Sequence, residues 1–196
     1  MFPWRNLQIT AGFVLLTAWF ALANGFQPLA VVLTAAAVHE LGHYLVLTAC
    51  GAQISGLRLS ALGAVLETDS VRLSYGKELA AVLAGPGANL LCALSLTAAG
   101  GGRWSVLAGA NFILCAFNLL PVRPLDGGRA LYLAASWLAG PAAGESIVRW
   151  TGAAFALGLT ALLAYVMWRS GGSLWLLPAA MASCGAALSG ITGRTP

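Results

Sequence analysis

The chain contains a long stretch that carries no ionisable side chain. No acidic or basic residue occurs between Arg5 and His39, which is enough chain for two membrane crossings if it turns near residues 24–28. The composition agrees, because 59% of the residues are hydrophobic and only 8% are charged, whereas soluble domains carry about 25% charged residues. The sequence therefore predicts an all-α, polytopic membrane protein.

Apolar segments separated by polar or glycine-containing turns predict six transmembrane segments. They are residues 7–23, 29–50, 79–99, 104–140, 147–168 and 174–188. The fourth is too long for one straight helix, and it contains Pro121, Pro124 and the pair Gly127-Gly128, which interrupt helices. We expect a broken fourth helix that lines a cavity, because irregular backbone within a bilayer must be buried in protein or face water.

Short extended pieces are expected between the second and third segments. Within residues 53–68, apolar and polar residues alternate from Leu57 to Ser60, and a turn near Gly63 would close a small β-hairpin. An ordinary solvated loop is the alternative for this stretch. No linker-rich or repeated segment interrupts the chain, so we expect residues 1–196 to form a single membrane domain.

The positive net charge of +4 is better explained by membrane topology than by nucleic-acid binding. The basic residues are scattered singly, without the basic patch that a nucleic-acid interface needs. If the amino terminus is cytoplasmic, Arg103 and Arg169 are the basic residues left on the far side, and the rest satisfy the positive-inside rule. Those on or toward the cytoplasm are Arg5, Arg58, Arg72, Lys77, Arg123, Arg129, Arg149 and Arg194. We expect a bacterial cytoplasmic membrane, with both termini cytoplasmic.

Both histidines of the chain lie in one motif, His39-Glu40-Leu41-Gly42-His43. Residues at i and i+4 share a helix face, so both imidazoles can reach a single Zn²⁺. The glutamate between them would then stand beside a metal-bound water, whose pKa zinc lowers toward about 7. This pattern predicts Glu40 as the general base of a hydrolase, and the alternative is a pair of polar residues between helices.

Zinc in hydrolases commonly has three protein ligands, so the two histidines need a partner. Glu40 and Asp126 are the acidic residues that fall inside apolar segments. An intramembrane carboxylate costs about 2.5–3.5 kcal/mol, which a bound cation offsets. We predict that His39, His43 and Asp126 bind one zinc ion per chain, although Asp126 could also be a helix N-cap. Asn118 precedes the helix break and is a candidate oxyanion donor, or a tie between helices.

Two motifs of the sequence, taken together, resemble those of a known family. The His39–His43 motif, followed by Asn118-x-x-Pro121-x-x-Pro124-Leu125-Asp126-Gly127-Gly128, resembles the site-2 protease family of intramembrane zinc metalloproteases. The segment Gly85-Pro86-Gly87-Ala88-Asn89 resembles a further element of that family. The likeness covers about residues 29–131, and the compact six-span layout is most similar to the sporulation-factor-processing branch.

This resemblance implies regulated cleavage of a membrane-anchored protein within or next to its membrane segment. The implied partners are that substrate, the lipid bilayer and a regulatory membrane protein. The hairpin at residues 53–68 could pair with an unwound substrate by β-augmentation. Two other classes of protein remain alternatives. A membrane metal-ion transporter would normally show several polar spans. A noncatalytic scaffold that binds membrane proteins would have no need of the intact Glu40.

Overall fold

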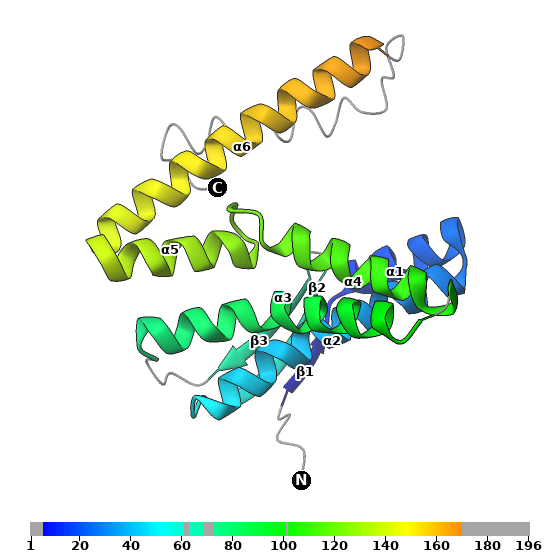
Figure 1. The fold of residues 1–196 in the computed structure, drawn as a ribbon, viewed down its shortest axis with the longest axis horizontal. Coiled ribbons are helices and arrows are strands. Elements are labelled where there is room, and N and C mark those ends of the chain that lie inside the picture. Colours follow the sequence, from blue (N-terminus) through cyan, green and yellow to red (C-terminus); the bar gives the residue numbers. More distant parts are fainter. Residues whose placement is uncertain (1–5, 61–62, 69–72, 101, 170–196) are drawn as a thin grey trace. The chain divides into compact units, whose positions relative to one another are not determined.

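A computed structural model describes residues 6–60, 63–68, 73–100 and 102–169. It is mostly helical with one small sheet (Figure 1). The chain divides into two compact units, residues 1–119 and 120–196. The elements of the first unit are β1 (Asn6–Ile9), α1 (Ala11–Asn24), α2 (Phe26–Ala49), β2 (Ile54–Ser60), β3 (Gly63–Thr68), α3 (Tyr75–Ala98), the 3₁₀ turn η1 (Gly102–Trp104) and α4 (Ser105–Asn118). The described elements of the second are α5 (Asp126–Ala139) and α6 (Pro141–Arg169).

Small residues form the interior of the first unit, where α2, α3 and α4 pack together. Gly42 on α2 lies against α3 so closely that a Cβ atom there would overlap the Ala84 carbonyl group and the Ala88 side chain. The buried positions of α3 include Ala81, Gly85, Asn89 and Ala93, a four-residue spacing that keeps them on one face. Small faces of this kind let helices approach closely, as is typical of helix pairs in membranes.

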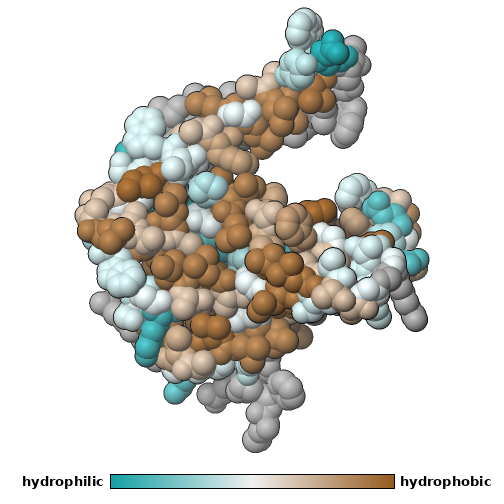
Figure 2. Space-filling model, viewed as in Figure 1, coloured by the Kyte–Doolittle hydropathy of each residue, from teal (hydrophilic) through white to brown (hydrophobic). Residues whose placement is uncertain are grey.

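Large apolar side chains, in contrast, lie on the outside. Leu22 on α1 is 89% exposed and Leu138 on α5 is 87% exposed, and hydrophobic residues cover much of the face shown in Figure 2. Exposed apolar surface on this scale is unfavourable in water and favourable against lipid tails. Small and polar residues inside with large apolar residues outside therefore identify an integral membrane protein.

Three helices within the described residues are long and apolar enough to cross a bilayer: α2, α3 and α6. They correspond to the second, third and fifth predicted segments. The helices α1 and α4 are apolar but shorter, with 14 residues each, or about 21 Å of the roughly 30 Å hydrocarbon thickness. The sixth predicted segment, residues 174–188, lies outside the described residues, so six complete spans stay a prediction.

The first predicted segment is wrong at its start. Residues Asn6–Ile9 form strand β1 rather than helix, and Thr10 caps α1, its hydroxyl group accepting a hydrogen bond from the Phe13 N–H group. The apolar run did not distinguish helix from strand here because β1 is stabilised by a distant partner. It pairs in parallel with β2, with Leu7 opposite Leu57.

The predicted hairpin between α2 and α3 is confirmed and is part of a three-stranded sheet with the order β1-β2-β3. Strands β2 and β3 are antiparallel, with Leu57 opposite Leu66 and a register irregularity at Ile54 and Gly56. Strand β1 pairs with one edge of β2, and β3 pairs with the other. The edge of the hairpin that pairs with no other described strand is therefore that of β3.

The break in the fourth predicted segment is also confirmed. Helix α4 ends at Asn118 and α5 begins at Asp126. Within the second unit, Arg123 from the intervening loop donates two hydrogen bonds to the Glu145 carboxylate, at 3.0 and 2.7 Å. Gly128 lets this loop fold back on α5, since a Cβ atom there would overlap the Val122 backbone.

Candidate metal centre

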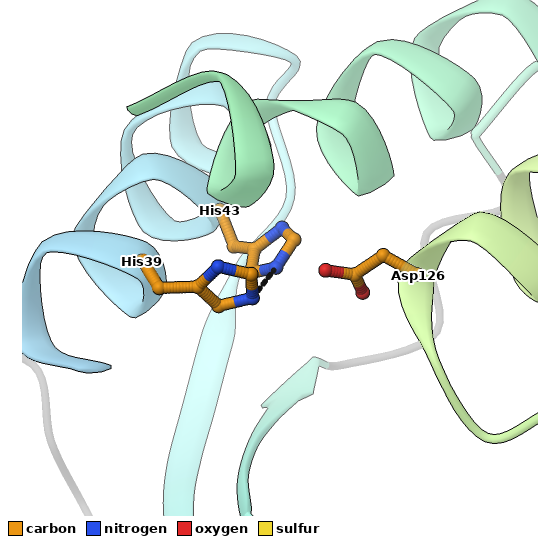
Figure 3. Close-up of side chains that lie close together, drawn as sticks. All are labelled: His39, His43 and Asp126. Carbon is orange, nitrogen blue, oxygen red and sulfur yellow. Dashed lines mark hydrogen bonds between the residues drawn. The ribbon is translucent and has the colours of Figure 1, made fainter. Parts of the chain in front are cut away.

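The two histidines of α2 direct their Nε2 atoms toward one another (Figure 3). The distance between His39 Nε2 and His43 Nε2 is 3.1 Å. His39 is buried, with 7% of its surface exposed, and His43 is half-buried. The helical i, i+4 spacing brings these side chains together as predicted.

The tautomer of His39 follows from its partner on α3. The Asn89 amide nitrogen donates to the Ala35 carbonyl oxygen at 2.9 Å and to Asn111 Oδ1 at 2.8 Å, so its Oδ1 atom faces His39 Nδ1 at 2.7 Å. An amide oxygen only accepts hydrogen bonds. His39 Nδ1 therefore carries a proton, and the neutral ring has its lone pair on Nε2.

The tautomer of His43 is set in the same way by a backbone group. Its Nδ1 atom lies 2.8 Å from the Ala81 carbonyl oxygen, which also only accepts. Gly85, one turn further along α3, lies directly against the His43 ring, and a Cβ atom there would overlap the imidazole. The neutral His43 ring likewise has its Nε2 lone pair directed toward His39.

This arrangement fits a metal ion. Two nitrogen lone pairs that face one another at 3.1 Å repel unless a cation lies between them. At zinc–nitrogen distances of about 2.0–2.1 Å, two ligands of a tetrahedral site lie roughly 3.3 Å apart, close to the observed separation. Ligating histidines also commonly donate their other ring N–H group to a protein oxygen, as both rings do here.

Glu40 follows His39 on α2 and is partly buried. Being one residue from His39 and three from His43, it flanks the face of the helix that carries both imidazoles. This is the position that a general base beside the two imidazoles requires.

Asp126 belongs to the second unit, where it is the first residue of α5 (Figure 3). Leu125 holds the N-cap position of that helix, with extended backbone and no side-chain capping bond. The alternative reading of Asp126 as the N-cap residue is therefore not the one observed. Its carboxylate lies in the first turn, where the helix dipole favours negative charge.

Asn118, the predicted oxyanion donor, is the last residue of α4. Its side-chain nitrogen donates to the Leu114 carbonyl oxygen at 3.0 Å, which uses one of its two N–H groups. It lies seven residues after Asn111, so both occupy the same stripe of the helix.

Asn111 is the polar residue of this centre that sequence reasoning missed. It is fully buried on α4 and accepts a hydrogen bond from Asn89. The available signal was an amide side chain inside an apolar segment, which calls for a buried partner. The neighbouring residues in the sequence do not identify that partner, because it lies on another helix.

Comparisons with known proteins agree with this geometry. The family model of peptidase family M50 matches residues 28–103 and 101–159. A candidate zinc metalloprotease of Synechocystis sp. is 33% identical over 102 residues, which cover 47% of this chain and 27% of that protein. The chain thus spans about a quarter of the length of this curated relative.

The fold also has a solved counterpart. The site-2 protease from Methanocaldococcus jannaschii superimposes with a TM-score of 0.62 at 21% identity, covering 97% of this chain and 91% of that one. At this identity the likeness concerns the fold, whereas the family model covers more than half of the sequence. The resemblance drawn from the paired motifs is confirmed, and the chain belongs to peptidase family M50, the family of the site-2 proteases.

Proposed function

We propose that this protein is an intramembrane zinc endopeptidase that hydrolyses a peptide bond in or next to the membrane segment of a membrane-anchored protein. The observation that carries the proposal is the histidine pair, whose Nε2 lone pairs converge with both Nδ1 atoms engaged by protein oxygens. Membership of peptidase family M50 supports the same activity.

His39, His43 and Asp126 would hold one zinc ion per chain. Their donor set of two imidazole nitrogens and one carboxylate oxygen is one that catalytic zinc sites use, and it leaves a position for water or substrate. When bound, zinc acts as a Lewis acid that polarises a carbonyl group and acidifies water near neutral pH. The cation would also offset the cost of placing the Asp126 carboxylate in the membrane.

Glu40 would move the protons of the reaction. Its carboxylate accepts the proton of the attacking water and then delivers it to the amine that leaves. Asn118 would donate its remaining amide N–H group to the oxyanion that develops on the peptide carbonyl. These roles need a water-accessible site, which the interrupted backbone between α4 and α5 could line.

The proposed setting is a multi-pass protein of the bacterial cytoplasmic membrane with both termini cytoplasmic. Its partners would be the bilayer, a membrane-anchored substrate and a regulatory membrane protein. The bias of basic residues toward one side supports this orientation.

The test is the Glu40→Gln variant of the full chain, which keeps the shape of the side chain but removes its basicity. We expect cleavage in native membranes to fall by about 10²–10⁴-fold, as for the loss of a general base, with zinc bound at one ion per chain. The uncut substrate should accumulate with the variant, where it can be captured and identified. Glu78→Gln on α3 is the matched control and should keep cleavage.

Other outcomes separate the alternative classes. A metal transporter has no need of a proton-shuttling glutamate, so metal uptake into vesicles that persists in Glu40→Gln would contradict the protease. A noncatalytic scaffold would bind its partner protein without cutting it. The captured partner would then have the same length with the wild type and with the Glu40→Gln variant. If the His39→Ala variant loses zinc and the Glu40→Gln variant keeps it, His39 is assigned as a metal ligand and Glu40 as the base.

A further inference from the structure

A chain of hydrogen bonds runs from the backbone of α4 to the histidine pair on α2. Asn111 donates to the Leu107 carbonyl oxygen at 2.9 Å and accepts from Asn89 at 2.8 Å. Asn89 in turn accepts from His39 Nδ1 at 2.7 Å. Both asparagines are fully buried, with 0% of their surface exposed.

The direction of this chain is determined by carbonyl groups that can only accept. The Leu107 oxygen requires the NH₂ group of Asn111 on its side, which turns Asn111 Oδ1 toward Asn89. The Ala35 oxygen independently requires the NH₂ group of Asn89, which turns its Oδ1 toward His39. Reversing either amide would place two acceptors against each other in a buried site, which is costly.

We infer that Asn89 and Asn111 are positioning residues that fix His39 with its Nε2 lone pair presented to a metal ion. Asn89 acts directly on the imidazole, and Asn111 holds Asn89 in place from α4. Both N–H groups of Asn89 are engaged, so its Oδ1 cannot turn away from His39 without breaking two bonds. The inference deepens the proposed function and rests on it.

The acceptor for His39 is an uncharged amide rather than a carboxylate. A carboxylate in the same place raises the basicity of a ligating histidine more strongly. A neutral relay instead orients the ring without placing a further charge in the membrane interior, where a charge is costly. The pair Asn89 and Asn111 thus orients the ring without adding charge, and the charges of the proposed centre come from its ligands and Glu40.

Two substitutions at Asn89 separate positioning from simple helix tying. Asn89→Leu removes the acceptor, and we expect zinc affinity to fall about 10–100-fold, the usual loss for such outer partners. Asn89→Asp keeps an oxygen facing His39 Nδ1 but loses both donated bonds and adds a buried charge. It should unfold at lower temperature than the wild type and yet bind zinc at least as tightly.

The measurement is zinc competition with a chromophoric chelator, using the full-length chain in detergent at fixed pH, alongside thermal unfolding of the zinc-free protein. A role limited to joining helices predicts that zinc affinity follows stability, with Asn89→Asp losing as much as Asn89→Leu. That result would overturn the inference. Thr97→Val removes an intrahelical hydrogen bond on the same helix and serves as the control, with unchanged affinity.

Asn111→Leu tests the second step and serves if the Asn89 variants do not fold. It leaves Asn89 held by the Ala35 carbonyl oxygen alone, so we expect a smaller loss of zinc affinity, below about tenfold. Unchanged affinity would overturn the relay beyond Asn89. Wild-type protein that binds no zinc would refute the proposed function itself, whereas zinc bound equally by wild type and Asn89→Leu would refute only the inference.

Discussion

At the residue scale, Gly85 determines how closely α3 can approach the His43 imidazole. The ring is held from one side by the Ala81 carbonyl oxygen and lies directly against Gly85. Gly85 and Gly87 belong to the segment Gly85-Pro86-Gly87-Ala88-Asn89, which carries part of the family resemblance. The structure divides its two glycines, because Gly85 contacts a proposed ligand whereas a Cβ atom at Gly87 would meet nothing within 4 Å.

Gly85→Ala should therefore weaken metal binding. The added methyl group must displace the His43 ring, and we expect zinc affinity to fall at least about tenfold, with about 1–3 kcal/mol lost from stability through overpacking. Chelator competition and thermal unfolding measure the two effects. Gly87→Ala on the same helix is the control and should change neither by much; equal zinc affinity in both variants would contradict this role of Gly85.

At the element scale, the sheet differs from the isolated hairpin that the alternation of residues 57–60 indicated. Strand β2 is central, paired with β1 on one side and β3 on the other. Proline in β2 would disrupt the sheet itself, so it cannot separate substrate pairing from folding. Among the described strands, β1 and β3 are the two edges of the sheet, and β3, whose Val65 side chain is exposed, is the edge that belongs to the predicted hairpin.

A proline scan along β3 tests β-augmentation. Successive residues of a strand direct their N–H groups alternately toward and away from a neighbour, so Ala64→Pro and Val65→Pro should differ. The substitution at the outward-facing N–H group removes a donor to the substrate, and cleavage should fall while zinc content stays at the wild-type level. Val65→Thr keeps the N–H group and should cleave normally; full cleavage in both proline variants would rule out pairing along this edge.

At the scale of the whole molecule, strand pairing bears on membrane topology. Residues 6–9 lie beside residues 54–60 in the sheet, so both belong to one side of the membrane. We predict that the chain between them, α1 and α2, leaves that side and returns to it. The helix α3, which is long and apolar enough to cross a bilayer, would then depart from the same side and place the start of α4 on the opposite one.

This topology predicts which segments a protease can reach. A tag before β1 should be cleaved in inverted membrane vesicles, and a tag inserted after Gly100 should be protected there. Right-side-out vesicles should give the reverse pattern, and a carboxy-terminal tag should behave like the amino-terminal one. Equal accessibility of the first two tags would contradict the crossing of α3.

The amino-acid sequence by itself determined the features that depend on local spacing and composition. The apolar runs indicated a membrane protein, the i, i+4 spacing placed His39 and His43 on one face, and the proline and glycine residues after Asn118 ended α4. Each follows from helix periodicity or from backbone restrictions within a few residues. Local chemistry was sufficient for these predictions.

Tertiary structure alone decided which polar groups complete the centre. Asn89, Asn111 and Asn118 look alike in an apolar sequence, yet Asn89 is the one that reaches His39, from 50 residues away. The parallel pairing of β1 with β2 was likewise invisible. Such partners are chosen by how helices and strands pack across long sequence separations, and hydrophobic periodicity within one element does not specify them.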